Sequence, residues 1–391
     1  MKLSKNQDLF LKAVLSGKNV FLTGKAGTGK SFVVSQAIEQ LKKLRKNVVA
    51  LAPTGIAANN IGGQTIHSMF GLDPFGVLTY ETCRYFKSEK RRVMEKIDVI
   101  FIDEVSMLRP DILDAINWTL LKNGCKSLKS IQIIFVGDLK QLPAVIDDNM
   151  RSMLFTKYDG SEFFDAKVYK QLGVESIELD EVLRQTDEEF ISHLNIIREG
   201  GKSDYFKKFI GTESRGVVLA PHKATVTKYN IDGLNKIDSK EYVFDAQISG
   251  KVKLADFNLE PKVTVKDGAT VMYLINSKNN NLVNGKIGIF RVIDDNFFID
   301  VKGVKYPLEP IQLSKKEYVL NDAEDALELK EIGSITQIPI RLAYALTIHK
   351  SQGLTFEEVT IDLSRDCFSK GQLYTALSRC KSPAGLVIIN R

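Results

Sequence analysis

Residues 24–31 read Gly-Lys-Ala-Gly-Thr-Gly-Lys-Ser, which is the pattern of a P-loop. An apolar run over 19–23 precedes them, and a helical pattern over 32–44 follows. Glycines in such a loop let backbone N–H groups curl around phosphates, while the lysine reaches the β- and γ-phosphates and the serine hydroxyl binds Mg²⁺. The pattern predicts a nucleoside triphosphate site. Its candidate residues are Gly24, Ala26, Gly27, Thr28, Gly29, Lys30 and Ser31.

The composition is that of an ordinary globular protein. The chain has 391 residues, 44% of them hydrophobic and 26% charged, which predicts two or three domains with ample core. No apolar run approaches the length of a membrane span, and the first residues lack the apolar core of a signal peptide. Four scattered cysteines indicate neither a zinc site nor a disulfide framework. A net charge of +6 permits a polyanionic partner without requiring one.

Apolar runs continue after the P-loop and alternate with helical stretches. They cover 47–52, 97–102 and 131–136. Continuous apolar strands separated by helices are typical of a parallel sheet that is covered on both faces, and ligands gather at the carboxyl ends of such strands. The fold class is therefore predicted to be α/β.

Polar residues follow two of these runs directly. Asp103 and Glu104 directly follow the run 97–102, and Gln141 lies in the polar cluster that follows the run 131–136. An acidic pair at a strand end is usually only solvated, but beside a P-loop it has the form of a Walker B site. Asp103 is then expected to hold Mg²⁺ with Ser31, and Glu104 to deprotonate the attacking water. Gln141 is placed to sense the γ-phosphate or the water.

The α/β pattern starts again beyond residue 174, without a second P-loop. Its strand-like runs are 175–179, 217–220, 342–346, 359–363 and 386–389. Two arginines of this half stand in suggestive contexts, Arg184 in a Leu-Arg-Gln stretch and Arg379 on a predicted helix. An isolated arginine is normally a surface residue. A role as an arginine finger, which neutralises charge on the transferred phosphoryl group, depends here on the surrounding motifs.

Taken in order, these motifs strongly resemble those of superfamily 1B DNA helicases, in particular the Pif family. The motifs lie at 7, 24–31, 52–58, 65–68, 103–107, 137–143, 183–185, 345–353 and 374–379. The resemblance implies two RecA-like domains with parallel sheets that clamp ATP and Mg²⁺ between them. Arg184 and Arg379 then reach across from the second domain. Gln7 contacts adenine, and Gln352 with Gly353 couples the nucleotide to the DNA track.

The resemblance also implies a single-strand groove across both domains. Its candidate residues are Thr54, Thr65, His67, Thr347, His349 and Lys350. Hydroxyls, imidazoles and an ammonium suit contacts to phosphates and sugars that do not read sequence. One segment departs from the family pattern, because His222 and Lys223 stand where many relatives carry Pro-Thr-Asn. Its role is left open.

Two insertions are expected. By resemblance, residues 70–92 form a small wedge subdomain in a first domain of residues 1–173. In it, Phe75 and Tyr80 are candidates either for stacking at the duplex fork or for core packing. Short β runs predict a small barrel over 236–336, which the resemblance makes SH3-like. Residues 174–235 and 337–391 then form the second domain. The acidic stretch 322–331 is interpreted as a solvated surface segment.

The function that the resemblance implies is an ATP-dependent DNA helicase. It would move 5′-to-3′ on single-stranded DNA and unwind duplex or structured DNA, G-quadruplexes among the family's associated substrates. Single-stranded and forked duplex DNA are its expected partners, as a monomer or a DNA-induced dimer, in the cytoplasm and nucleoid of a prokaryote. Two alternatives remain open: a P-loop kinase of small metabolites, and an ATP-gated single-stranded-DNA-binding NTPase that separates no strands.

Overall fold

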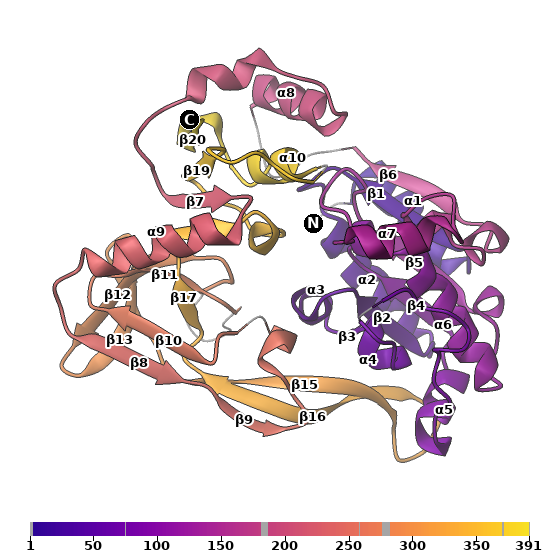
Figure 1. Ribbon diagram of the computed structural model, residues 1–391. Coiled ribbons are helices and arrows are strands. Elements are labelled where there is room, and N and C mark those ends of the chain that lie inside the picture. The colour runs from indigo at the N-terminus through magenta and orange to yellow at the C-terminus, as the bar shows by residue number, and fades with distance from the viewer. Residues whose placement is uncertain are drawn as a thin grey trace.

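The computed structural model describes residues 3–74, 76–180, 187–257, 259–275, 282–369 and 371–390. It contains two parallel sheets and several antiparallel ones, so the predicted α/β class is confirmed (Figure 1). The first parallel sheet has the order β3-β2-β4-β5-β1-β6. Its strands are β1 (Val20–Gly24), β2 (Val48–Ala52), β3 (Gln64–Thr65), β4 (Val99–Ile102), β5 (Gln132–Val136) and β6 (Glu175–Leu179).

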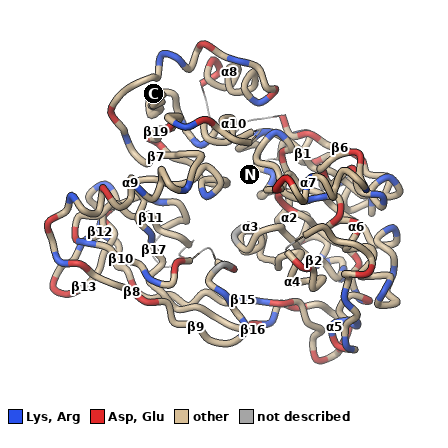
Figure 2. Tube along the Cα trace, viewed as in Figure 1, with Lys and Arg blue, Asp and Glu red and all other residues tan. Residues whose placement is uncertain are grey.

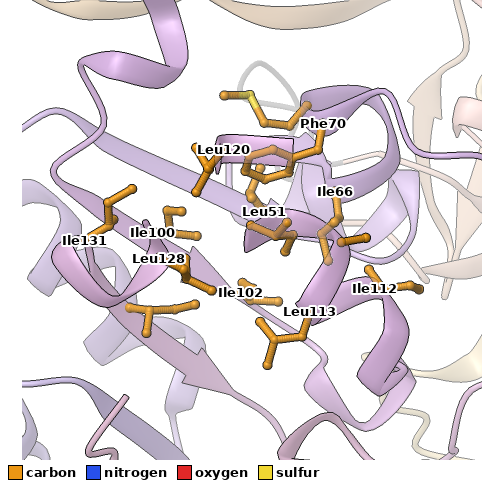
Figure 3. Packing of buried hydrophobic residues seen from close by; sticks show 14 of the residues in the cluster. Leu51, Ile66, Phe70, Ile100, Ile102, Ile112, Leu113, Leu120, Leu128 and Ile131 are labelled. Carbon is orange, nitrogen blue, oxygen red and sulfur yellow. The ribbon is translucent and has the colours of Figure 1, made fainter. Parts of the chain in front are cut away.

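Helices cover both faces of this sheet. Strand β4 shows why, because Ile100 and Ile102 belong to one buried cluster and Val99 and Phe101 to the other, as the alternation of side chains along a strand requires. Figure 3 shows part of the larger cluster. The helices of this half are α1 (Lys5–Leu15), α2 (Lys30–Lys43), α3 (Gly55–Asn60), α4 (Ile66–Phe70), α5 (Ser88–Glu95), α6 (Pro110–Lys122) and α7 (Asp148–Phe155). Short 3₁₀ turns are η1 (Val105–Met107), η2 (Leu128–Ser130), η3 (Phe163–Asp165) and η4 (Tyr169–Gln171). In the described part of the chain, no helix is both long and apolar enough to cross a membrane.

Strand β6 corrects the predicted start of the second domain at residue 174. It pairs in parallel with β1, with Ile177 beside Leu22, and so completes the first sheet. An apolar run identifies a strand but not the sheet that it joins, because pairing depends on residues distant in the sequence. The first domain therefore extends at least to Leu179.

The second parallel sheet has the order β18-β7-β19-β20. Its strands are β7 (Val217–Ala220), β18 (Ala345–Thr347), β19 (Val359–Asp362) and β20 (Leu386–Ile389). Around it lie α8 (Glu188–Arg198), α9 (Lys223–Asn235), α10 (Gln372–Leu377), η5 (Asp204–Phe209), η7 (His349–Ser351) and η8 (Pro383–Gly385). The predicted strand 342–346 is in fact split, because β17 (Ile340–Leu342) lies in an antiparallel sheet and only β18 lies in the parallel one.

Antiparallel strands fill the segment between α9 and β18. They form the sheets β14-β13-β12-β11-β17, β10-β8 and β15-β16-β9. The strands not yet given are β8 (Glu241–Asp245), β9 (Gln247–Gly250), β10 (Lys262–Lys266), β11 (Thr270–Tyr273), β12 (Ile287–Ile293), β13 (Asn296–Val301), β14 (Val304–Pro307), β15 (Ile311–Leu320) and β16 (Leu327–Gln337), with the turn η6 (Leu254–Phe257). Because β17 pairs with β11, this region extends past its predicted end at residue 336.

Strands β15 and β16 form a long hairpin, the β15–β16 arm, which returns to the first domain (Figure 1). Tyr318 is buried against the first domain's core, and its Oη accepts a hydrogen bond from the N–H of Ala50 at 2.9 Å. Leu320, Leu327 and Leu329 pack against the same core. The second half of the chain therefore meets the first at the arm as well as through the parallel-sheet domains.

The tip of the arm carries the acidic stretch that was interpreted as solvated. Glu324 forms an ion pair with Arg92 of α5, where acidic and basic positions face each other (Figure 2). Asn47 accepts a hydrogen bond from the N–H of Leu327 at 2.9 Å and donates one to the carbonyl of Asp325 at 3.3 Å. The acidic side chains of the stretch are exposed, so its interpretation as a solvated surface segment is confirmed. The stretch is in addition a docking contact, which neither charged segment reveals on its own.

Candidate nucleotide and nucleic-acid sites

A cleft of about 370 Å³ lies at the carboxyl ends of β1, β4 and β5, within the size range of ligand sites. It is lined by Ala26, Gly27, Thr28, Gly29, Lys30, Ser31, Phe32, Asp103, Glu104, Gly137, Asp138, Gln141, Gly353 and Arg379. The last two come from the second half of the chain, so two domains build the cleft. Most of the predicted nucleotide and catalytic residues therefore meet in one place.

The P-loop joins the end of β1 to the start of α2. Its three glycines have φ angles of 146°, 83° and 82°, in the region that residues with a Cβ rarely adopt. At Gly24 a Cβ would also lie 2.5 Å from the carbonyl oxygen of Leu179 in β6. Gly29 caps α2 without a side chain, which leaves the first N–H groups of the helix for an anion. The Nζ of Lys30 donates to the carbonyls of Gly24 and Lys25 at 2.8 and 2.9 Å, inside the loop.

The acidic pair follows β4 in a sharp turn. Glu104 has a φ of 53°, and its N–H donates to Oδ1 of Asp103 at 2.9 Å. Burial raises the pKa of both carboxyls; the positive charges of Lys30 and Arg379 act against this rise at Glu104. Asp103 and Ser31 both line the cleft, and a carboxylate with a hydroxyl is the hard oxygen ligand set that Mg²⁺ prefers. The residues present thus fit a magnesium ion.

Gln141 lies on a loop that contacts the second domain. Its Nε2 donates to Oδ2 of Asp138 at 3.4 Å, and Oδ1 of Asp138 forms an ion pair with Arg198 of α8 at 3.0 Å. The side chain of Asp138 is buried, and that of Arg198 is only 11% exposed. The next residue, Leu142, packs into the core of the second domain beside Phe190. Sequence reasoning missed Arg198, because nothing in its own segment distinguishes it from a surface arginine.

Helix α10 and the turn after it bring two further groups to the nucleotide site. The prediction that Arg379 lies on a helix is wrong, because α10 ends two residues earlier, at Leu377. The Oη of Tyr374 accepts a hydrogen bond from the P-loop N–H of Ala26 at 3.4 Å. Tyr374 lies within a recognised motif but was not predicted as a site residue. Arg379 is buried and donates to the carbonyls of Thr375 and Leu354 and to the hydroxyl of Ser378. The other predicted arginine, Arg184, lies outside the described residues.

Gln7 and Gln352, the other two predicted glutamines, are not among the residues that line the cleft, but each contacts one that is. Gln7 is buried in the first turn of α1, where it forms a capping box with Ser4, and its Nε2 donates to the carbonyl of Thr28 at 3.5 Å. Gln352 follows η7 and donates to Oε2 of Glu104 at 3.0 Å. A residue beside the DNA candidates of the second domain thereby touches the predicted catalytic base.

The DNA candidates of the first domain lie at the amino ends of two short helices. Thr54 caps α3 and Thr65 caps α4, each accepting one backbone hydrogen bond at 3.3 Å. Burial, and then the charge of Arg109, lowers the pKa of His67 in α4, so its imidazole is neutral at pH 7. The turn η6 lies against α3, where a Cβ at Gly55 would clash with the backbone of Asp256.

The DNA candidates of the second domain lie in one short segment after β18. Thr347 accepts a hydrogen bond from the N–H of Lys350 at 3.2 Å, and His349 and Lys350 form η7. Burial lowers the pKa of His349 and of Lys350, and the positive charges of Arg341 and Lys223 lower that of Lys350 further. These candidates are grouped as predicted, but their contacts to DNA stay predictions.

The wedge candidates differ in what can be said of them. Tyr80 is exposed, and Nζ of Lys122 lies 5.2 Å from the centre of its ring. Phe75 falls outside the described residues. An exposed ring at Tyr80 is compatible with stacking and does not fit the alternative of core packing.

A P-loop in one parallel-sheet domain that faces an arginine and a glutamine from another defines a two-domain P-loop NTPase. The model of the PIF1-like helicase family matches residues 2–208, and that of the UvrD-like helicase C-terminal domain matches residues 342–387. The chain therefore belongs to the PIF1-like helicase family.

Relatives match over nearly the whole chain. The ATP-dependent DNA helicase Pif1 of Campylobacter jejuni is 31% identical over 97% of this chain and 90% of the relative. Pif1 from Bacteroides sp in complex with ADP-AlF4 is 36% identical over 99% of this chain and 92% of its own, with a TM-score of 0.88. With the same identity and coverage, TM-scores fall to 0.71 for Bacteroides Pif1 bound to single-stranded DNA and 0.70 for two coordinating Pif1 helicases at forked double-stranded DNA.

Proposed function

We propose that this chain is an ATP-dependent DNA helicase that hydrolyses ATP in the cleft and moves along single-stranded DNA. One observation carries the proposal. Within seven residues, the segment from Thr347 to Gly353 holds the second-domain DNA candidates, donates through Gln352 to Glu104, and enters the nucleotide cleft. A shift of this segment on a DNA strand reaches the predicted catalytic base directly. A metabolite kinase has no need of such a link.

The proposed chemistry divides among the cleft residues. Backbone N–H groups of the P-loop and Lys30 hold the phosphates, while Ser31 and Asp103 would hold Mg²⁺, which would supply positive charge against the phosphates. Glu104 takes a proton from the attacking water and Gln141 orients that water. Arg379, with Arg184, stabilises the charge that develops on the transferred phosphoryl group. Gln7 binds the adenine.

The proposed DNA path crosses both domains through Thr54, Thr65 and His67 on one side and the segment after β18 on the other. Relatives that bind single-stranded DNA and forked double-stranded DNA support these substrates. The family resemblance supports movement 5′-to-3′ and an SH3-like nature of the antiparallel region. The proposed assembly is a monomer or a DNA-induced dimer, and the proposed location is cytoplasmic and nucleoid-associated, in a prokaryote.

A forked-duplex assay tests the proposal. Duplexes with a 5′ tail, a 3′ tail or no tail are mixed with the protein and ATP, and strand separation is followed by fluorescence. Unwinding of the 5′-tailed substrate alone is expected, and Glu104→Gln should bind ATP but unwind nothing. ATP turnover that DNA does not stimulate would favour the kinase alternative. DNA-stimulated turnover without strand separation would favour the ATP-gated binding module.

A further inference from the structure

Three aromatic rings gather where the sequence departs from its family pattern. His222 stands at the amino end of α9, which lies toward the middle of the molecule (Figure 1). The ring centre of His222 lies 5.2 Å from that of Phe368. The ring centre of His349 lies 6.1 Å from that of Phe368, and these two rings are nearly parallel, with an angle of 18° between their planes. Asp366 fixes the first imidazole, since its carbonyl oxygen is 3.1 Å from Nε2. The cluster thus joins a residue of unassigned role to a DNA candidate.

The phenyl ring is the exposed member of this cluster. Phe368 is 60% exposed, whereas both histidines are partly buried. Burial lowers the pKa of His349, which keeps that imidazole neutral at pH 7. Two rings therefore support the phenyl ring from the protein side, and more than half of the surface of Phe368 faces solvent.

A cation is adjacent to this cluster in the sequence. Lys350 directly follows His349, whose ring lies against Phe368. An ammonium next in the chain to an aromatic cluster with an exposed ring favours a ligand that is anionic and also carries a flat apolar group. Single-stranded nucleic acid has this composition, because phosphates satisfy the cation while unpaired bases stack on the ring.

We propose that Phe368, supported by His222 and His349, stacks on an unpaired base of the bound strand. This site rests on the proposed function, and it differs from the predicted groove in kind, because all groove candidates are predicted to contact the sugar-phosphate backbone. It assigns His222 a supporting role at the position where the family pattern is lost.

The backbone of this stacking site is tied to the nucleotide cleft. The N–H groups of Phe368 and Ser369 both donate to Oε1 of Gln372, at 3.0 and 3.3 Å. Gln372 is fully buried and is the first residue of α10, the helix that presents Tyr374 to the P-loop. A base stacked on Phe368 would therefore contact a segment whose backbone is hydrogen-bonded to the start of α10, the helix that carries Tyr374.

The test compares Phe368→Leu with the wild-type protein on two strands of equal length, one oligo-dT and one abasic, by fluorescence anisotropy. Loss of one base stack should weaken binding to oligo-dT by about 5-fold to 150-fold. Binding to the abasic strand should not change, because that strand offers no base. Phe368→Trp keeps an aromatic face and should restore binding to oligo-dT. Equal affinities of the leucine variant and the wild type for oligo-dT, or equal losses on both strands, would overturn the proposal.

Controls separate this proposal from folding and from the proposed function. Phe155→Leu makes the same change at a ring that is 51% exposed on α7, and it should leave both affinities unchanged. Thermal unfolding checks that each variant is folded. The salt dependence of oligo-dT binding should keep its slope in Phe368→Leu, because no cation is removed, whereas Lys350→Ala should flatten it. A wild-type protein that binds neither strand would contradict the helicase function itself, not only the stacking site.

Discussion

Two of the places where the second half of the chain contacts the first differ in kind. At the cleft the contacts are polar and largely buried: Gln352 with Glu104, Tyr374 with the P-loop, and Arg198 with Asp138. At the β15–β16 arm, leucines and Tyr318 cover an apolar surface, and the Arg92–Glu324 ion pair at the tip is half exposed. The cleft contacts involve groups assigned to ATP chemistry and the arm contacts do not. We therefore expect changes at the cleft to alter turnover and changes at the arm to alter stability.

The largest effect is expected at Arg379. Replacement by alanine removes the charge that would stabilise the transferred phosphoryl group, and an arginine in that role contributes about 10³ to 10⁵ in rate. DNA-stimulated ATP hydrolysis should fall by that factor, while binding of a fluorescent ATP analogue persists. Arg379→Lys should remain well below the wild type, because lysine lacks the planar fork of donors. Turnover close to wild type in the alanine variant would make this arginine structural and would break the comparison.

Arg198→Ala should lower both ATP turnover and stability, because Arg198 neutralises the carboxylate of Asp138, which accepts a hydrogen bond from Gln141. Removing one partner of a buried ion pair costs about 3–5 kcal/mol. Urea unfolding should show a loss of that order, and kcat should fall more than the KM for ATP changes. The double variant Arg198→Ala, Asp138→Ala should lose less stability than the sum of the single changes. Additive losses would show that the pair does not couple the two domains.

Tyr318→Phe tests the arm. The change leaves the N–H of Ala50 buried without its partner, which costs about 1–3 kcal/mol. Unfolding should shift accordingly and ATP turnover should not. The same substitution at Tyr85, an exposed tyrosine of the first domain, supplies the matched control and should be close to neutral. A fall in turnover at constant stability would place the arm among the parts that act on the chemistry.

The smallest effect is expected at the tip. Arg92 and Glu324 have side chains 46% and 54% exposed, and such pairs contribute about 0–1 kcal/mol, less at high salt. Arg92→Ala should therefore reduce the free energy of unfolding only slightly in low salt and not measurably in high salt. Exchanging the two charges, with Arg92→Glu and Glu324→Arg together, should recover the wild-type value. A large loss of stability in Arg92→Ala would show that this ion pair contributes more to the free energy of unfolding than its exposure predicts.

The sequence predicted the site best where a functional residue lies close after a strand. Lys30, Asp103, Glu104 and Gln141 each lie within a few residues of the strand that positions them, so the order of motifs predicts that they meet at one edge of a sheet. The structure brings them into one cleft, and their catalytic roles stay predictions until variants are measured. The two parallel sheets were predicted for the same reason.

What the sequence could not give depends on distant pairing. Arg198 pairs with Asp138, 60 residues away in the sequence, and Tyr318 forms a hydrogen bond with Ala50, 268 residues away. Strand β6 has the same apolar pattern whichever sheet it joins, and residues 342–346 look like one strand although a change of sheet divides them. Local patterns fix the kind of element, whereas its partner is chosen by shape and burial in the folded chain.

The docking of the arm has a consequence for synthesis on the ribosome. Ala50 is made 268 residues before Tyr318, and at about 5–20 residues per second this interval is on the order of tens of seconds. Throughout it, the first domain displays to solvent the apolar face that the arm later covers. Nascent chains of this protein should therefore bind chaperones through that face, and release from them should follow the emergence of β15 and β16 rather than completion of the first sheet.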